Sequence, residues 1–261
     1  MTVAQIAPPN ITELPSEYSI SAPEVIWQIG FFPITNTLLS SLLFTFYFSI
    51  VAIFFSTRFT MVPGKLQALF EVLFEYIYNM TEKMAGENVH SYFPWLMTFC
   101  LFILISNLSA LLPGFASIGL YRLIDGEQVY IPLFRSINSD LNVTLALALI
   151  SVFITHYFAI RSLGSIAYLK KWFSFKMFGI SLFVGLLELV AEFTKIISLS
   201  FRLYGNITAG KILLKTSKSF FPFILPLPFY FLEVMVAFIQ SAVFVMLTLV
   251  FMVILSKKKE D

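Results

Sequence analysis

Three uncharged apolar runs, residues 34–57, 93–112 and 141–160, most constrain what this chain can fold into. A helix needs about 20 mostly apolar residues to cross the hydrocarbon core of a bilayer, and each run has that length. Charged residues make up only 12% of the chain, which is too little to cover the surface of a water-soluble protein of this size. The sequence therefore predicts an all-α integral membrane protein.

Two longer apolar segments follow in the carboxyl-terminal third, at residues 178–218 and 222–256. Pro222, Pro226 and Pro228 mark a turn between them and the start of the last helix. The first of these segments carries several charges, whereas the second carries only Glu233. Together with the three uncharged runs, they bring the predicted number of transmembrane helices to five.

Residues 65–85 have a different pattern. Their apolar side chains recur at helical spacing, at Leu66, Leu69, Phe70, Leu73 and Ile77. Charged side chains interrupt them at Glu71, Glu75, Glu82 and Lys83. Such a pattern is typical of an amphipathic helix that lies at the membrane interface and does not span it.

Basic residues predict the sidedness. They follow the first, third and last crossings, at Arg58, Lys65, Arg161, Lys170, Lys171, Lys176 and Lys257–Lys259. Residues 1–33 contain no Lys or Arg. The positive-inside rule then places residues 1–33 outside the cytoplasm, with residues 34–261 as a single membrane domain. The loop at 113–140 and the turn at 215–222 face the same outer side.

Several function classes are disfavoured. The net charge of +2 is small and scattered, so nucleic-acid binding is not expected. The sole cysteine, Cys100, permits no disulfide framework, and two distant histidines, His90 and His156, make a metal site unexpected. We interpret His90 as solvated and His156 as structural. No phosphate-binding glycine loop is present, so we expect no bound nucleotide and no cofactor.

Ionisable residues lie inside the segment 178–218, where each costs about 2.5 to 3.5 kcal/mol at the centre of a bilayer. They are Glu188, Glu192, Lys195, Arg202 and Lys211. Lys215 and Lys218 are close enough to the helix end to extend to the interface, and for Lys211 both this reading and a place within the membrane stay open. Arg202 is too deep for that, so it indicates a protein interface or an ion path.

Helical spacing groups these residues. At about 100° per residue, one stripe lies within about 80° of Arg202. It comprises Ser198, Lys195, Glu188, Asn206 and Glu192. Lys211 lies on the opposite face, and Glu233 and Gln240 share a face of the last helix. This pattern predicts two polar pockets, one open to each side, with Arg202 between them. Arginine cannot relay a proton at ordinary pH, but it can attract a carboxylate and block a leak.

The motif Ser198-Leu-Ser-Phe-Arg202-Leu-Tyr-Gly-Asn206-Ile-Thr-Ala-Gly210 resembles the signature of subunit a of rotary proton-translocating ATP synthases. Asn107-Leu-Ser-Ala-Leu-Leu-Pro113 and the segment beginning Asp140-Leu-Asn142 are similar to the second and third crossings of that family. Glu188 and Gln240 match a family acid and a family glutamine. The resemblance covers roughly residues 20–256.

The resemblance implies a non-catalytic stator subunit in a bacterial plasma membrane or, alternatively, a mitochondrial inner membrane. Its last two helices would form a tilted hairpin against a ring of c subunits, whose carboxylates Arg202 would face. Glu233 and Gln240 would line the outer proton path, and Glu188 and Glu192 the inner one. The other implied partners are the b subunits of the peripheral stalk, the remainder of the complex and the lipid bilayer.

One position departs from the family pattern. Lys211 stands where relatives usually carry Glu or His. We interpret it as an electrostatic partner that keeps Glu233 ionised. Two other classes were weighed. A free-standing transporter would often show paired internal repeats, and only the last third of this chain is rich in intramembrane charge. A membrane-embedded enzyme would need a His, Cys or Asp cluster.

Overall fold

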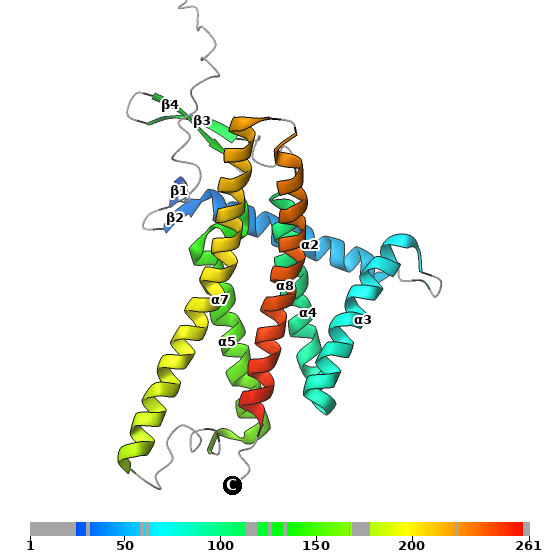
Figure 1. Cartoon of the computed structure of the whole chain (residues 1–261), viewed down its shortest axis with the longest axis vertical. Helices are drawn as coiled ribbons and strands as arrows, with labels where there is room; N and C mark the ends of the chain where they lie inside the picture. The colour runs from blue at the N-terminus through cyan, green and yellow to red at the C-terminus, as the bar shows by residue number, and fades with distance from the viewer. Residues whose placement is uncertain are drawn as a thin grey trace, which may run out of the picture.

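The computed structural model describes residues 25–29, 32–57, 60, 63–112, 119–124, 127–132, 135–166, 168, 178–222 and 224–257 (Figure 1). The longer helices are α2 (Asn36–Thr57), α3 (Lys65–Ala85), α4 (Val89–Ser109), α5 (Leu141–Leu163), α7 (Phe178–Phe220) and α8 (Pro226–Ser256). Two 3-10 helices, η1 (Gly86–Asn88) and η3 (Ile137–Ser139), precede α4 and α5. The described chain also contains the short strands β1 (Val25–Ile29), β2 (Phe32–Thr35), β3 (Gly119–Ile124) and β4 (Glu127–Pro132).

Four helices, α4, α5, α7 and α8, run along the long axis of the molecule (Figure 1). Helix α8 packs against α4, α5 and α7, and α5 packs against α7. Large apolar side chains fill the centre of this bundle, and Leu96, Ile103, Phe244 and Leu249 are almost fully buried. The bundle holds α7 and α8 together as an antiparallel hairpin.

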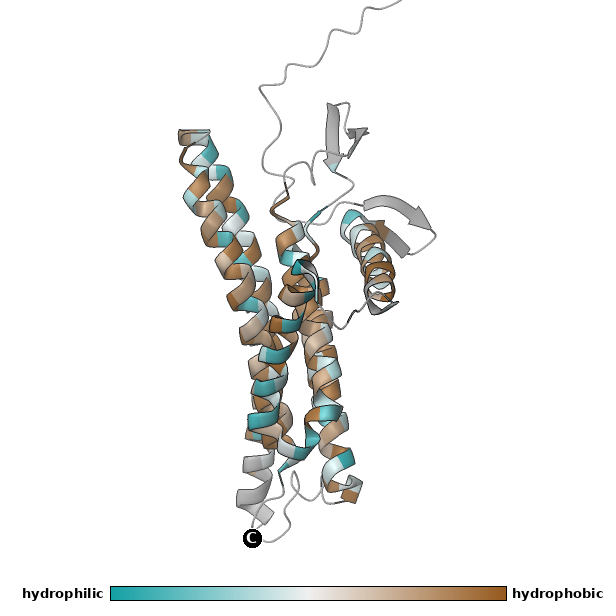
Figure 2. Cartoon of the chain, turned by 90° about the vertical axis from the view of Figure 1, so that its right-hand side faces the viewer, coloured by the Kyte–Doolittle hydropathy of each residue, from teal (hydrophilic) through white to brown (hydrophobic). Residues whose placement is uncertain are grey.

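Many large apolar side chains lie on the outer surface of the helices. The exposed fraction is 73% for Phe153 and 67% for Ile53. Figure 2 shows hydrophobic residues along the outward faces of the helices. By length and composition, four stretches of the described chain can cross a membrane: Asn36–Phe54, Gln67–Ser109, Leu141–Leu163 and Pro226–Ser256. The chain is therefore a multi-pass membrane protein with a helical body.

Helix α7 is long enough to span, at 43 residues, but it is not among those four stretches. Its charges, Glu188, Glu192, Lys195 and Arg202, interrupt the apolar composition. A count of five crossings is reached only if α7 spans as well. Each charge at that depth needs a partner or water. Whether α7 can span the membrane therefore depends on what surrounds these four side chains.

Helix α3 covers the range predicted for the amphipathic helix. It lies against α4, where Ile77 is buried and the ring of Phe74 meets that of Phe93, with 6.1 Å between centroids. Its acidic residues Glu71 and Glu75 are exposed. One face of α3 is thus covered by protein, whereas the charged face is open.

Helix α2 crosses the direction of the bundle and does not run along it (Figure 1). Its first turn is fixed to the bundle, because Ser40 Oγ accepts a hydrogen bond from the backbone N–H of Arg135 at 3.0 Å. Asn36, Thr37 and Ser40 are buried there, but most of the later side chains of α2 are exposed.

Local signals set several helix ends. The carboxylate of Asp140 caps α5 by accepting a hydrogen bond from Asn142 N at 2.9 Å. Gly86 and Gly164 end α3 and α5 with φ values of 54° and 82°. Glycine suits these positions because it adopts positive φ without a steric penalty from Cβ.

The two β-hairpins are an addition to the predicted all-helical membrane domain. Strand β1 pairs with β2, and β3 with β4, both antiparallel. The loop predicted at 113–140 therefore contains regular structure. The missed signal was Asp125-Gly126, because an Asp-Gly pair between runs of β-forming residues is a strong indication of a hairpin. In the register, Ile124 pairs with Glu127 across these two positions.

Several predictions concern residues outside the described part of the chain. Most of the amino-terminal segment 1–33 lies there, as do Arg58, Lys170, Lys171, Lys176 and two of the final lysines, Lys258 and Lys259. The sidedness that these residues suggested stays a prediction.

Candidate functional site

Arg202 lies in the interior of α7 and points away from the bundle. Its neighbours Leu199 and Leu203 are buried, whereas Arg202 itself is exposed. Phe201 and Ile197, with 54% and 52% exposure, make the surrounding surface apolar. Within the described chain, Arg202 makes no recorded hydrogen bond or ion pair. The structure thus leaves a permanent positive charge on an apolar helix surface without a partner from the described residues.

Small residues surround this arginine. Ser198, one turn earlier, is exposed, and Ala209, two turns later, is exposed as well. At Gly205 an added Cβ would meet no atom of the described chain within 4 Å. Short side chains on this surface would allow another helix to approach the guanidinium closely.

Asn206 and Gln240 join the two helices of the hairpin. Asn206 Nδ2 donates a hydrogen bond to Gln240 Oε1 at 2.6 Å. The amide nitrogen of Gln240 is buried and has no hydrogen-bond partner in the described chain. An unpaired buried donor at this position is suited to a bound water or to a group that arrives during function.

Glu233 of α8 lies against Gly210 of α7. The carboxyl of Glu233 occupies the space that a Cβ at position 210 would fill. Glu233 is only 7% exposed, so an acidic side chain is buried between the two helices. A glycine at position 210 makes room for it, which sequence spacing did not reveal.

Lys211 is half-buried and next in sequence to Gly210. The predicted pairing of Lys211 with Glu233 is not formed as an ion pair among the described residues. Among the described residues, Arg135 is the charged group with an electrostatic effect on Lys211. Arg135 is itself buried, and its Nε donates to Ser139 Oγ at 3.2 Å. A second cation, and not a carboxylate, therefore acts on the lysine.

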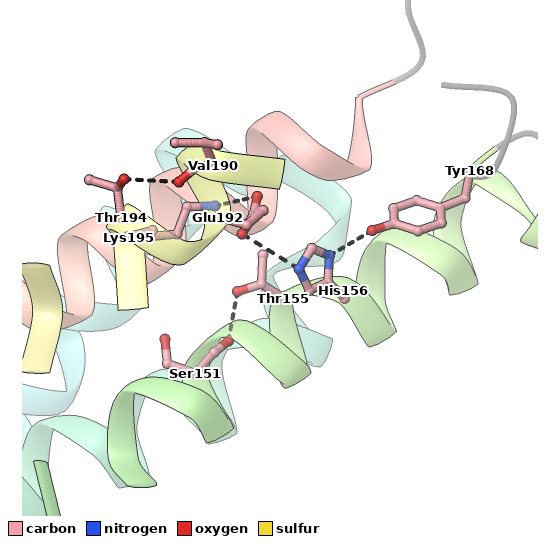
Figure 3. Close-up of polar contacts among 8 residues, drawn as sticks. All are labelled: Ser151, Thr155, His156, Tyr168, Val190, Glu192, Thr194 and Lys195. Atoms are coloured by element: carbon pink, nitrogen blue, oxygen red, sulfur yellow. Dashed lines mark hydrogen bonds and ion pairs between the residues drawn. The ribbon is translucent and has the colours of Figure 1, made fainter. Parts of the chain in front are cut away.

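A second polar group lies towards the other end of α7 (Figure 3). Lys195 Nζ is 2.7 Å from Glu192 Oε1 and 4.0 Å from the centre of the Phe251 ring. Glu192 Oε2 is 3.5 Å from His156 Nε2 of α5. The other nitrogen of that imidazole, Nδ1, is 2.6 Å from the hydroxyl of Tyr168. The interpretation of His156 as merely structural missed this contact with Glu192.

The structure thus separates the predicted polar residues into three places. Glu192 and Lys195 turn towards the bundle, while Ser198 and Arg202 turn outward. Asn206 faces Gln240, and Glu233 lies beyond them. Glu188, half-buried, is one turn before Glu192. At about 1.5 Å per residue, Glu192 lies about 15 Å from Arg202 along α7, and Gly210 about 12 Å from it on the other side.

His156 and Tyr168 could have been found only in part from the sequence. Arg161 indicates that the end of α5 lies on the same side as the start of α7. This would have placed His156 at a similar depth to Glu192. Nothing in the sequence indicates that Tyr168, which follows α5, turns back onto the imidazole. In the described chain, no three His, Cys, Asp or Glu residues are grouped so as to hold a metal ion.

These features define a multi-pass membrane protein with ionisable groups inside its helical bundle and a charged residue on an apolar face. A model of the ATP synthase A chain family matches residues 36–253. The "ATP synthase subunit a" of Geotalea daltonii is 32% identical over 202 residues, covering 77% of this chain and 79% of its own length. That of Geobacter sulfurreducens is 32% identical over 73% of this chain and 74% of its own. The "ATP synthase subunit a" of Campylobacter jejuni subsp. doylei is 31% identical, covering 78% of this chain and 82% of its own length.

The chain therefore belongs to the ATP synthase A chain family. Members of this family are non-catalytic membrane subunits that take part in ATP synthesis and proton transport.

Proposed function

We propose that this chain is the stator subunit a of a rotary ATP synthase, in a bacterial plasma membrane or, alternatively, a mitochondrial inner membrane. It would form two proton half-channels and couple proton flow to rotation of a c-subunit ring. The b subunits of the peripheral stalk would hold it in place against that rotation. The observation that carries the proposal is Arg202, a fixed charge on an apolar surface of α7 without a recorded partner in the described chain.

A charge in that position requires a partner from another molecule. The carboxylates of a c ring meet this need, because a guanidinium can bind a carboxylate through two parallel hydrogen bonds. The guanidinium also keeps its proton at ordinary pH, so protons cannot pass through it from one half-channel to the other. Attraction of the ring carboxylate and separation of the half-channels would then be two consequences of one side chain.

Polar groups on either side of Arg202 support the two half-channels. Towards the turn between α7 and α8 lie Asn206, Gln240, Lys211 and Glu233, which we assign to the outer path. Towards the start of α7 lie Glu188, Glu192 and Lys195, which we assign to the inner path. Ser198, on the same exposed side as Arg202, would face the ring. A proton would thus reach the ring on one side of Arg202 and leave it on the other.

The lengths of the helices support a tilted hairpin. At about 1.5 Å per residue, α7 and α8 are about 64 and 46 Å long, whereas the hydrocarbon core is about 30 Å thick. A spanning helix longer than the core tilts or extends beyond it.

Substitution of the arginine tests the proposal. We expect Arg202→Ala to abolish ATP-driven proton pumping in inverted membrane vesicles while the complex still assembles. Lys218→Ala is the control: it removes a cation from the exposed outer end of the same helix, and we expect pumping near the wild-type rate. Pumping by Arg202→Ala at that rate would refute the proposal.

Arg202→Lys tests why arginine is needed. We expect this variant to fail also, because an ammonium lacks the planar fork and can lose its proton when desolvated. ATP synthesis at the normal rate in Arg202→Lys would mean that a positive charge alone is enough.

A further inference from the structure

His156 connects the inner group of polar residues to the end of the bundle. Its imidazole lies between two oxygen atoms, with Nε2 3.5 Å from Glu192 Oε2 and Nδ1 2.6 Å from Tyr168 Oη (Figure 3). The three residues come from α5, α7 and the segment after α5. A carboxylate, an imidazole and a phenol therefore follow one another from the interior of the bundle outward.

The two carboxylate oxygens of Glu192 differ in their hydrogen bonding. Oε1 accepts a hydrogen bond from Lys195 Nζ at 2.7 Å. Oε2 is buried and has no hydrogen-bond partner in the described chain. Its polar neighbour is the imidazole Nε2, which is slightly too far for a good hydrogen bond at 3.5 Å. Because a buried carboxylate oxygen needs a donor, a proton on either Oε2 or Nε2 would draw the two groups together.

The surroundings allow this imidazole to exchange protons with water. The side chain of His156 is 24% exposed, and that of Glu192 is 15% exposed. The titratable or charged groups seen facing the pair are Tyr168 after α5 and Lys195 of α7, while α8 contributes the Phe251 ring beneath Lys195. Histidine is a common proton-transfer group in proteins. Because the side chain of His156 is partly exposed, water can deliver a proton to its imidazole or remove one.

We infer that His156 is a proton-transfer residue at the mouth of the inner path, accepting protons from Glu192 and releasing them to water. This inference rests on the proposed function. In the release step, the O–H bond of protonated Glu192 breaks and an Nε2–H bond forms. The imidazolium then gives its Nδ1 proton to the Tyr168 hydroxyl, which passes its own proton to water. The neutral ring regains its starting tautomer by exchange with solvent. ATP-driven pumping runs the same steps in reverse.

Lys195 acts as a positioning residue in this scheme, whereas Tyr168 both orients the imidazole and relays its proton to water. The ammonium of Lys195 holds Oε1, which leaves Oε2 directed at the imidazole. The hydroxyl of Tyr168 holds Nδ1 and thereby orients the ring. His156 differs from both, because it is the group that accepts the proton directly from Glu192.

The test uses the whole ATP synthase in inverted vesicles, where the medium contacts the inner path and the lumen contacts the outer path. The initial rate of ATP-driven proton pumping is measured at several medium pH values between pH 6 and 8, with the lumen pH fixed. At each pH this rate is divided by the rate of ATP hydrolysis measured with an uncoupler, which gives a ratio of pumping to hydrolysis. Removal of a positioned proton-transfer group costs about 10²-fold in the step that it serves. We expect His156→Gln to lower this ratio at least about tenfold and to flatten its dependence on medium pH.

His90→Gln is the matched control, since it makes the same substitution at the exposed histidine near the start of α4. We expect it to keep the wild-type profile. His156→Gln would overturn the inference if its profile is unchanged, or if its ratio is lower by the same factor at every pH, as a merely structural contact between α5 and α7 would give. If His156→Gln fails to assemble, Tyr168→Phe, which removes only the hydroxyl, takes its place. A shift in its medium-pH midpoint supports the inference, and an unshifted midpoint overturns it.

Arg202→Ala in the same vesicles separates the two proposals. If Arg202→Ala is inactive while His156→Gln has the wild-type profile, only the role of His156 is refuted. If Arg202→Ala pumps normally, the proposed function fails, and with it the inference that rests on it.

Discussion

The position of Glu233 depends on the absence of a single side chain. Its carboxyl fills the space beside Gly210 that a Cβ would need. Gly210 lies within a helix, where glycine costs about 1 kcal/mol relative to alanine. The room that glycine leaves for Glu233 gives a physical reason for accepting that cost.

Alanine at position 210 tests this reason. We expect Gly210→Ala to push the Glu233 carboxyl away from α7 and to impair proton uptake from the outer side. A typical destabilisation for overpacking is about 1 to 3 kcal/mol. Gly205→Ala is the control for the effect of alanine on the stability of the helix, because its Cβ would meet no atom of the described chain within 4 Å. Equal thermal stability of the two variant chains, measured without the rest of the complex, would contradict the steric argument.

Lys211 and Glu233 should differ in importance. Lys211 is not in ion-pair contact with Glu233, and Arg135 acts on it instead. We therefore expect Glu233→Gln to impair outer-side proton uptake more severely than Lys211→Gln, because of these two residues of the outer path only the carboxylate is expected to relay a proton. The double variant should be no worse than Glu233→Gln, since groups on one path are not additive. The measurement is passive proton flux through the membrane sector under an imposed potential. Greater damage from Lys211→Gln would reverse the assignment.

At the scale of elements, polar contacts inside the bundle connect helices that are distant in sequence. Ser151 Oγ of α5 and Thr248 Oγ1 of α8 are 2.8 Å apart, and both side chains are buried. Thr144 of α5 and Ser200 of α7 are joined in the same way at 3.1 Å. Helix packing in a bilayer relies on such small polar pairs and on close van der Waals contact.

Removal of one such contact should have a modest effect. Hydrogen bonds between transmembrane helices contribute about 0.6 kcal/mol on average and about 1.7 kcal/mol at most. We expect Ser151→Ala to lower the stability of the folded chain within that range. Thr45→Val is the control, because Thr45 is exposed and bonds only to Ser41 O of its own helix. Reversible unfolding in mixed micelles measures the difference. No difference between the two variants would mean that the contact does not stabilise the α5–α8 packing.

At the scale of the whole molecule, the number of crossings decides on which side of the membrane each end of the chain lies. Four stretches are apolar enough to span, and α7 would be the fifth. An odd number of crossings places the two ends of the chain on opposite sides of the membrane, whereas four crossings place them on the same side.

Cysteine labelling distinguishes these topologies. We expect single cysteines at Ser16 and Ser256, in a Cys100→Ser background, to react with an impermeant thiol reagent from opposite sides. Cys100 is buried, so its replacement by a small residue is conservative for this purpose. Right-side-out and inverted vesicles provide the internal control, because the cysteine that reacts in one kind of vesicle should be the protected one in the other. Reaction of both cysteines from one side would refute five crossings.

The elements and their order were predictable from the sequence, because they depend on local composition. Uncharged runs of about 20 residues identify spanning helices whatever their neighbours are, and the spacing of Leu69, Leu73 and Ile77 identifies α3. The motif around Arg202 also pointed to the family. The β3–β4 hairpin was within reach, since Asp125-Gly126 is a local signal.

The partners of the buried charges were decided only by the tertiary structure. Glu192 meets His156, and Glu233 lies against Gly210 where Lys211 was expected. Helical angles show which residues share a face of one helix, but they do not show how far that face is rotated or shifted against its neighbour. That relation depends on how α5, α7 and α8 pack along their whole length, as at Leu203, Phe244 and Leu249. A rotation of a few tens of degrees between packed helices is enough to replace one polar partner with another.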